Sequence, residues 1–172
     1  MNREYGTVKH LINLTVNGNR YDMTVSPNET LADAVRRKLR LTGTKISCNQ
    51  GDCGACTMLI DGKSQLSCLT LAVACEGKEI CTIEGLETNG ELDPIQRAIL
   101  EKQGVQCGFC TPGVIMSARG LLDENPNPTR EEIKRGLSGN LCRCTGYTKI
   151  IEAVESVVDA NRKQPKPAQL QR

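Results

Sequence analysis

The sequence has 172 residues, of which 38% are hydrophobic and 24% are charged, a composition typical of a globular protein with one ordinary domain or two small ones. Its 22 basic and 20 acidic residues give a net charge of +2, and aromatic residues make up only 2%. We therefore expect no nucleic-acid partner, because the chain has neither an obvious basic stripe for phosphates nor aromatic rings for stacking bases. No apolar run approaches the roughly 18 residues that a membrane span needs. The single histidine, His10, leaves little scope for histidine catalysis or a histidine-rich metal site.

The first part of the chain predicts a hairpin followed by a helix. Residues 11–16 and 20–25 alternate between apolar and polar side chains on either side of Asn17-Gly18, which is a strong hairpin signal because both turn residues tolerate positive φ. Residues 30–40 then place leucine and valine four positions apart, which predicts a helix. A hairpin followed by a helix indicates an α+β unit whose sheet is covered on one face.

A second hairpin is predicted further along. Residues 57–60 and 63–66 flank Asp61-Gly62, again a favoured two-residue turn. Residues 79–83 predict one more strand. We expect this first domain to end near Glu84.

The second half of the chain predicts four helices. They are expected over residues 93–104, with Gly104 as the closing residue, over 111–122 and 129–139, and around the apolar stripe of 150–158. The first and third begin with capping-box patterns. Short connections between four helices predict a compact all-α bundle.

These patterns divide the chain into three parts. Residues 1–84 form the predicted α+β domain and residues 85–160 the predicted four-helix domain. Residues 161–172 are polar with two prolines, which predicts an extended or disordered tail.

Ten cysteines are the most informative feature of the composition. Residues 1–10 contain no apolar segment typical of an export signal, so we expect a cytoplasmic protein. In the reducing cytosol, clustered cysteines are more often metal ligands than disulfides. The cysteines are Cys48, Cys53, Cys56, Cys68, Cys75, Cys81, Cys107, Cys110, Cys142 and Cys144.

The first cysteine group has the spacing C-x4-C-x2-C, at Cys48, Cys53 and Cys56. Gly51 and Gly54 in this loop let the backbone approach a bound ion and turn N–H groups toward it. The spacing is that of plant-type 2Fe-2S proteins, whose cluster needs four thiolates.

The fourth thiolate of this group is predicted from the second hairpin. Counting back along both strands from the expected turn places Cys56 opposite Ser67, directly beside Cys68. Cys75 and Cys81 have no comparable tether, and we interpret them as small buried apolar side chains. We therefore predict that Cys68 is the fourth thiolate ligand of this group.

The second cysteine group consists of Cys107-x2-Cys110 and Cys142-x-Cys144. Each pair precedes a predicted helix start. If the helices bring these starts together, an anionic thiolate cluster would lie between two positive helix ends.

Two structural zinc sites are the competing interpretation. Zinc modules with four thiolates usually pair C-x2-C with C-x2-C across about 15–20 residues, and neither group has that form. The four-residue gap of the first loop favours an iron–sulfur cluster. For the second group, spacing alone leaves iron–sulfur and zinc both open.

Taken together, the cysteine segments resemble the small iron–sulfur subunit of the molybdenum hydroxylase (xanthine dehydrogenase/oxidase) family. The matching stretches are GTKISCNQGDCGACTMLIDG, QCGFCTPGVIM and NPNPTREEIKRGLSGNLCRCTGY, with the helix that follows. The resemblance implies an N-terminal β-grasp, plant-type ferredoxin domain followed by an all-α four-helix bundle, each binding one 2Fe-2S cluster. It also assigns Cys107, Cys110, Cys142 and Cys144 to the second cluster, and places Gln106 and Cys144 against a pterin.

The partners follow from the same resemblance. It implies a large subunit that holds a molybdenum-pterin cofactor and a medium subunit that holds FAD, assembled as a dimer of three-subunit units. The helical cluster would lie nearest the molybdenum, and the ferredoxin cluster would pass electrons to FAD.

The residues themselves indicate an electron relay without substrate chemistry. The chain has no Gly-rich dinucleotide fingerprint, no phosphate loop and no plausible acid–base pair, so we expect no catalytic residue and no FAD site on it. Thiolate-held clusters transfer single electrons, with potentials set by burial and by N–H···S bonds. Two other classes are to be distinguished from this relay subunit: a free-standing ferredoxin-like carrier, and a zinc-stabilised interaction module.

Overall fold

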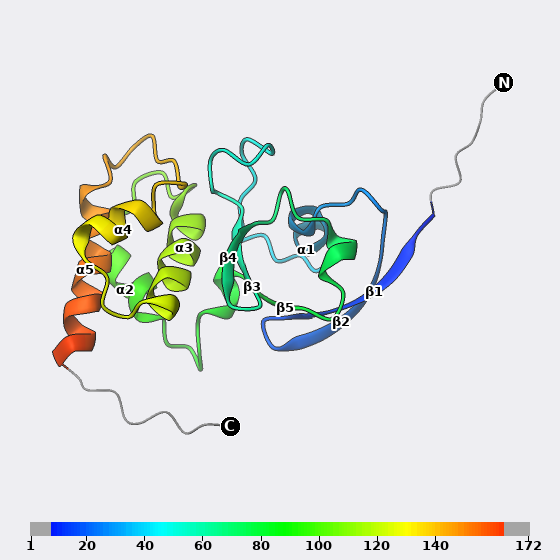
Figure 1. The fold of residues 1–172 in the computed structure, drawn as a ribbon, viewed down its shortest axis with the longest axis horizontal. Helices are drawn as coiled ribbons and strands as arrows, with labels where there is room; N and C mark the ends of the chain where they lie inside the picture. Colours follow the sequence, from blue (N-terminus) through cyan, green and yellow to red (C-terminus); the bar gives the residue numbers. More distant parts are fainter. Residues whose placement is uncertain (1–7, 164–172) are drawn as a thin grey trace.

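The computed structural model describes residues 8–163 and shows a sheet and a group of helices side by side (Figure 1). The sheet has the strand order β2-β1-β5-β3-β4. Strands β1 and β5 are parallel and the other neighbours are antiparallel, so the sheet is mixed and the fold is α+β, as predicted. The strands are β1 (His10–Val16), β2 (Asn19–Val25), β3 (Thr57–Ile60), β4 (Lys63–Leu66) and β5 (Glu79–Cys81).

One helix lies between the strands along the chain, and four follow the last strand. Short 3-10 turns, η1 (Ala72–Cys75) and η2 (Ile83–Gly85), flank β5. Within residues 8–163, no helix is long and apolar enough to cross a lipid bilayer. The α-helices are α1 (Leu31–Lys38), α2 (Pro94–Glu101), α3 (Thr111–Glu124), α4 (Arg130–Gly136) and α5 (Thr148–Lys163).

Both predicted hairpins are confirmed with their turns. Asn17 and Gly18 have φ of 51° and 76°, and Asp61 and Gly62 have φ of 49° and 77°. These left-handed conformations suit the right-handed twist of the flanking strands. Both capping boxes, at the starts of α2 and α4, are also present.

Strand β5 is shorter than the predicted 79–83. The N–H of Thr82 donates to Asn17 Oδ1 at 2.9 Å, and the next residues turn into η2. A side chain from the first hairpin thus takes the N–H that would have extended the ladder.

Two helix ends also differ from the prediction. Helix α2 ends at Glu101, and Gln103, not Gly104, adopts the left-handed conformation at φ 56°. Helix α5 continues through Lys163, so residues 161–163 are helical rather than part of the predicted tail. Basic residues in this last turn favour the helix because they face its negative end. The rest of that tail prediction, residues 164–172, lies outside the described residues.

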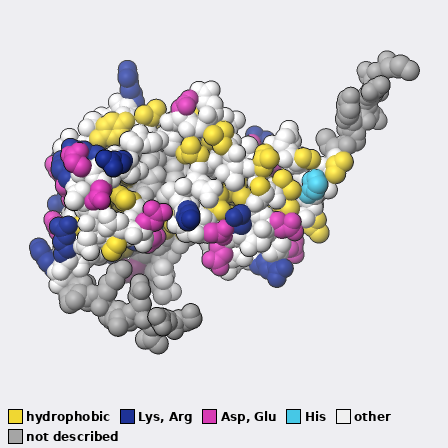
Figure 2. Space-filling model, viewed as in Figure 1, with side chains coloured by type: hydrophobic (Ala, Val, Ile, Leu, Met, Phe, Trp, Pro, Cys, Tyr) yellow, Lys and Arg dark blue, Asp and Glu magenta, His cyan; other side chains and the backbone are white. Residues whose placement is uncertain are grey.

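The apolar residues form two main cores. In the first, Leu14, Val35, Met58 and Ile60 are at most 1% exposed where α1 packs on the sheet. The second core joins α2, α3, α4 and α5 through fully buried aliphatic side chains such as Ile133. Charged side chains of both signs are interspersed on the face shown in Figure 2, without a continuous basic stripe on that face.

The prediction that the sheet is covered on one face is wrong at β3. All four residues of β3 are buried, because α3 lies against the face opposite α1. Contact is close where Gly120 of α3 meets Leu59 and Ser64, and Ser64 Oγ lies 3.5 Å from the carbonyl oxygen of Met116. The three consecutive apolar residues of this strand, Met58, Leu59 and Ile60, are typical of a strand buried on both faces.

Replacing Gly120 with valine should loosen this contact. A Cβ at this position would press on Ser64 Oγ and come within 3.2 Å of Leu59 Cδ2, and such overpacking costs about 1–3 kcal/mol. Thermal unfolding of the purified protein should show a lower Tm. Gly139→Ala is the matched control, since a Cβ there meets nothing within 4 Å and its effect should stay within about 0.5 kcal/mol. Equal Tm values for the two variants would contradict the packing argument.

The Asp61–Lys78 pair should make stability depend on pH. Lys78 Nζ donates to Asp61 Oδ2 at 2.9 Å and the N–H of Glu79 donates to Oδ1 at 3.0 Å, and these bonds lower the pKa of Asp61. A carboxylate whose pKa is lowered on folding stabilises the fold above its unfolded pKa of roughly 4 and loses this effect as pH falls through its folded pKa.

The variant Asp61→Asn isolates this effect, because asparagine also tolerates the left-handed turn conformation. The Tm difference between wild type and variant should be largest above roughly pH 4 and shrink at more acid pH. A difference that stays constant across the acid range would show that the charge does not contribute.

Candidate functional site

Two groups of cysteines lie in loops that the sheet and the helices position. The first loop runs from Cys48 to Cys56 and leads directly into β3, while Cys68 follows β4. Ser67 donates to the carbonyl oxygen of Cys56 through its N–H at 3.4 Å and through Oγ at 2.6 Å. The predicted placement of Cys56 opposite Ser67 is therefore confirmed, and Cys68 comes to lie beside the loop.

The four thiols of the first group lie in two contacting pairs. Cys53 lowers the pKa of the neighbouring Cys48, and Cys56 raises the pKa of the neighbouring Cys68. Cys56 and Cys68 are 2% and 4% exposed and pack with Ala32. The hairpin and the loop thus bring together the four cysteines that the spacing selected.

Backbone N–H groups point at the sulfur atoms of this group. The N–H of Gln50 donates to Cys48 Sγ at 3.5 Å, and this bond, with further backbone and side-chain donors, lowers the pKa of Cys48 to about 6. Burial and the neighbouring Cys56 raise the pKa of Cys68 to about 11. The N–H of Gly51 partly offsets this rise in the pKa of Cys68, and Gly51 has a φ of 92°, a conformation that favours glycine.

The second group is assembled by the helix starts, as the spacing predicted. Cys110 is the N-cap residue of α3, and the loop that carries Cys142 and Cys144 leads into α5. The thiols again lie in pairs: Cys142 raises the pKa of the neighbouring Cys110, and Cys107 raises the pKa of the neighbouring Cys144. Each pair joins residues more than 30 positions apart.

The environments of these four thiols differ. Burial and contact with Cys142 raise the pKa of Cys110 to about 12. Burial opposes ionisation of Cys142 as well, but donors from Thr145 and the N–H of Cys144 outweigh it and lower the pKa of Cys142 to about 7. Cys107 raises the pKa of Cys144 through a hydrogen bond and its charge.

Thr145 and Tyr147 surround Cys142, and sequence reasoning assigned neither of them this role. Thr145 contacts Cys142 Sγ through Oγ1 at 3.1 Å and through its N–H at 3.4 Å. The N–H of Cys142 donates to the Tyr147 hydroxyl at 2.9 Å. Tyr147 has a φ of 68°, which a residue with a Cβ adopts at some cost. The only sign of this role in the sequence is that Thr145 and Tyr147 follow Cys142 by three and five residues.

The second group opens to the surface more than the first. Cys107 and Cys144 are exposed, as is Gln106. Phe109 is 46% exposed and Leu141 is 56% exposed, so an apolar rim borders the thiols. Large apolar side chains exposed together at a potential redox site are typical of a surface that a partner covers.

The remaining cysteines lie apart from both groups. Cys75 is buried in the sheet core, as predicted, and lies 3.6 Å from the carbonyl oxygen of Leu71. Cys81 is only half-buried at the end of β5. His10 is exposed at the start of β1.

The donor set fits two 2Fe-2S clusters. All ten cysteines are unbridged, and eight of them form four pairs. Within residues 8–163, no three or more His, Cys, Asp or Glu side chains converge on one metal-ion position. A 2Fe-2S cluster has two irons with two protein ligands each, so two pairs of thiols are what each cluster requires.

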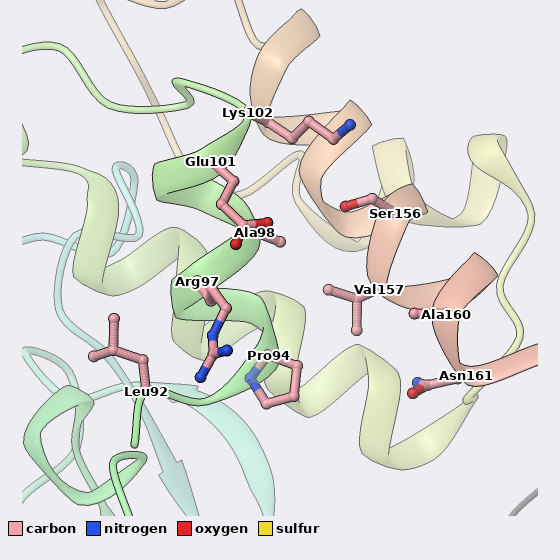
Figure 3. A pocket seen from close by; sticks show the side chains of 10 residues that line it. All are labelled: Leu92, Pro94, Arg97, Ala98, Glu101, Lys102, Ser156, Val157, Ala160 and Asn161. Carbon is pink, nitrogen blue, oxygen red and sulfur yellow. The ribbon is translucent and has the colours of Figure 1, made fainter. Parts of the chain in front are cut away.

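One surface groove lies apart from both cysteine groups. A groove of about 490 Å³ runs between α2 and α5, with side chains of both helices facing each other across it (Figure 3). It contains no cysteine. Its lining residues are Leu92, Pro94, Arg97, Ala98, Glu101, Lys102, Ser156, Val157, Ala160 and Asn161.

Comparison with known proteins identifies both cysteine groups by class. Residues 14–76 match a family described as a 2Fe-2S iron-sulfur cluster binding domain, and residues 82–155 match the 2Fe-2S binding domain family. The chain therefore carries two 2Fe-2S binding domains. For the second cysteine group, the spacing left both a zinc site and an iron–sulfur cluster open, and the family match favours the iron–sulfur cluster.

Relatives define the family more closely. The chain is 52% identical to the nicotine 6-hydroxylase small subunit of Paenarthrobacter nicotinovorans, over 83% of this chain and 86% of that subunit. It is 48% identical to one subunit of a probable xanthine dehydrogenase of Bacillus subtilis, over 84% and 83% of the two chains. Its structure superposes on quinoline 2-oxidoreductase from Pseudomonas putida 86 with a TM-score of 0.85 and 48% identity, covering 92% of this chain and 99% of that one. The chain belongs to the small iron–sulfur subunits of the molybdenum hydroxylase family.

Proposed function

We propose that this chain relays single electrons between a molybdenum-pterin site on a large subunit and FAD on a medium subunit. The observation that carries the proposal is the presence of two separate sets of paired thiols, each within a 2Fe-2S binding domain. A bound 2Fe-2S cluster supplies a centre that gains and loses one electron.

The domain organisation proposed here is a β-grasp ferredoxin domain over residues 1–84 and a four-helix domain over residues 85–160. The mixed five-stranded sheet with α1 across it supports the first, and the shared core of α2, α3, α4 and α5 supports the second.

The ligands proposed for the first cluster are Cys48, Cys53, Cys56 and Cys68, and for the second Cys107, Cys110, Cys142 and Cys144. The chain's role toward each cluster is to supply thiolates, to exclude water and to direct N–H groups at sulfur. Such donors favour the more negative, reduced state and so raise the reduction potential. The buried pair at Cys56 and Cys68 and the donors around Cys142 fit this role.

The second site is proposed to face the molybdenum-pterin, with Gln106 and Cys144 touching the pterin. Exposure of Gln106, Cys107 and Cys144, bordered by the apolar Phe109 and Leu141, supports this orientation. The first site would then face the FAD subunit. The nicotine 6-hydroxylase and xanthine dehydrogenase relatives are each one subunit of an enzyme, which supports an assembly of several different chains.

The assembly is proposed to be a dimer of three-subunit units in the cytoplasm. Ten unbridged cysteines suit a reducing compartment. No residue of this chain is proposed to act on the substrate.

Metal analysis tests the proposal directly. Anaerobically purified chain should contain about four irons and about four acid-labile sulfides, and dithionite reduction should produce two distinct electron paramagnetic resonance signals. Zinc without sulfide would contradict the relay. Co-purification should recover the chain with a molybdenum-containing and a flavin-containing subunit, whereas a monomer fully active with a soluble reductase would point to a free-standing carrier.

Alanine substitutions at two buried cysteines test the choice of the fourth ligand. Cys68→Ala should remove one of the two resonance signals and about half of the iron, because a 2Fe-2S cluster needs four ligands. Cys75→Ala should keep both signals, since Cys75 lies in the sheet core away from the other thiols. Loss of a signal in the Cys75 variant, with the Cys68 variant fully loaded, would reverse the assignment.

A further inference from the structure

The loops of the two thiol sites touch each other directly. The N–H of Leu141 donates to the carbonyl oxygen of Cys53 at 2.9 Å. Leu141 precedes Cys142 in the chain, so one hydrogen bond links the backbone of a residue in the first site to the backbone that enters the second. A path through bonds from Cys53 to Cys142 therefore crosses only this hydrogen bond and the backbone of Leu141.

A buried asparagine holds this contact in place. Asn140 is 3% exposed, and its Nδ2 donates to the carbonyl oxygen of Gly54 at 3.0 Å. Its own N–H donates to the carbonyl oxygen of Leu137 at 3.0 Å, which anchors it to the end of α4. The side chain of Asn140 therefore ties the first loop to the helical half one residue before the Leu141 hydrogen bond.

The backbone around Gly54 is closely packed on two sides. A Cβ at Gly54 would collide with the carbonyl oxygen of Gly139 and lie 2.6 Å from Asn140 Nδ2. A Cβ at Gly113, in the first turn of α3, would collide with the carbonyl oxygen of Gly54. The Gly54 peptide is thus enclosed between α3 on one side and Asn140 on the other, and glycine at both positions permits the close approach.

We propose that Asn140 is a positioning residue for electron transfer within the chain. It holds the Leu141–Cys53 backbone hydrogen bond, next to Cys142, through which an electron leaves the reduced cluster of the second site and enters the oxidised cluster of the first. One site loses the electron that the other gains, with no proton or further reactant. This inference rests on the proposed function, because it requires both clusters.

The test uses the complete, cluster-loaded protein with Asn140→Ala. The variant keeps all eight proposed ligands but loses the donor to Gly54, so we expect full iron and sulfide content. The spin–spin splitting between the two reduced clusters should weaken, and electron transfer from the second cluster to the first after rapid partial reduction should slow severalfold. These readouts do not depend on substrate turnover.

Ser64→Ala is the matched control. Ser64 contacts α3 across the same junction of sheet and helices, through its 3.5 Å approach to Met116, but does not touch either thiol loop. It should leave both the splitting and the transfer rate unchanged. Equal slowing in the Ser64 variant would show that general loosening of the junction, rather than Asn140, is responsible, and would overturn the proposal.

The remaining outcomes are also decisive. An Asn140→Ala protein with both clusters loaded, and with splitting and rate equal to wild type, would overturn the proposal while leaving the relay function intact. If this variant fails to load its clusters, Asn140→Ser, which is polar but too short to reach Gly54, takes its place under the same criteria. Wild-type protein without two clusters would instead refute the proposed function itself.

Discussion

Contact between thiols is the constraint on which this structure depends. Neighbouring thiols resist ionising together, because each thiolate raises the pKa of the next. The structure nevertheless holds eight of them in four pairs. It directs N–H and O–H donors at Cys48 and Cys142, whereas burial and neighbouring thiols raise the pKa of Cys68 and Cys110. Paired thiols of this kind are expected in a metal-binding site, because the positive charge of the bound metal offsets the repulsion between thiolates.

The two halves of the molecule reach this arrangement by different means. In the first, a short loop is closed by the β3–β4 hairpin, so local geometry alone brings Cys68 to Cys56. In the second, the helices must pack before Cys110 can meet Cys142, because α3 and α4 lie between them in the chain. The shared core of the helical half, with Ile133 and Ile150 nearly inaccessible, supplies the apolar burial that fixes these helix starts together.

The junction between the halves is itself tightly built. Helix α3 covers the second face of β3, and the Cys53–Gly54 peptides are bonded to Leu141 and Asn140. A flexible linker between two cluster-binding domains would let their separation vary. Here the hydrogen bonds from Asn140 to Gly54 and from Leu141 to Cys53, at the point where the thiol loops meet, restrict that separation.

Much of the local structure was predictable from the sequence. Both hairpin turns, both capping boxes and the placement of Cys56 opposite Ser67 follow from residues within about ten positions of one another, where backbone preferences and strand counting decide the outcome. The errors have a common cause. Strand β5 ends early because Asn17 takes the N–H of Thr82, and β3 is covered twice because α3 returns to it. Both contacts come from residues far away in the sequence, and only the short apolar run of β3 hinted at the second.

The sequence by itself therefore determined the cysteine spacing, the chemistry of the donor set and the family that the motifs resemble, because these reside in the order of residues along the chain. Only the tertiary structure decided which thiols pair in the second site, which side chains surround Cys142, and that Asn140 joins the two thiol loops. Those contacts connect residues up to 86 positions apart, and such contacts arise from the packing of whole elements rather than from the preferences of any one segment.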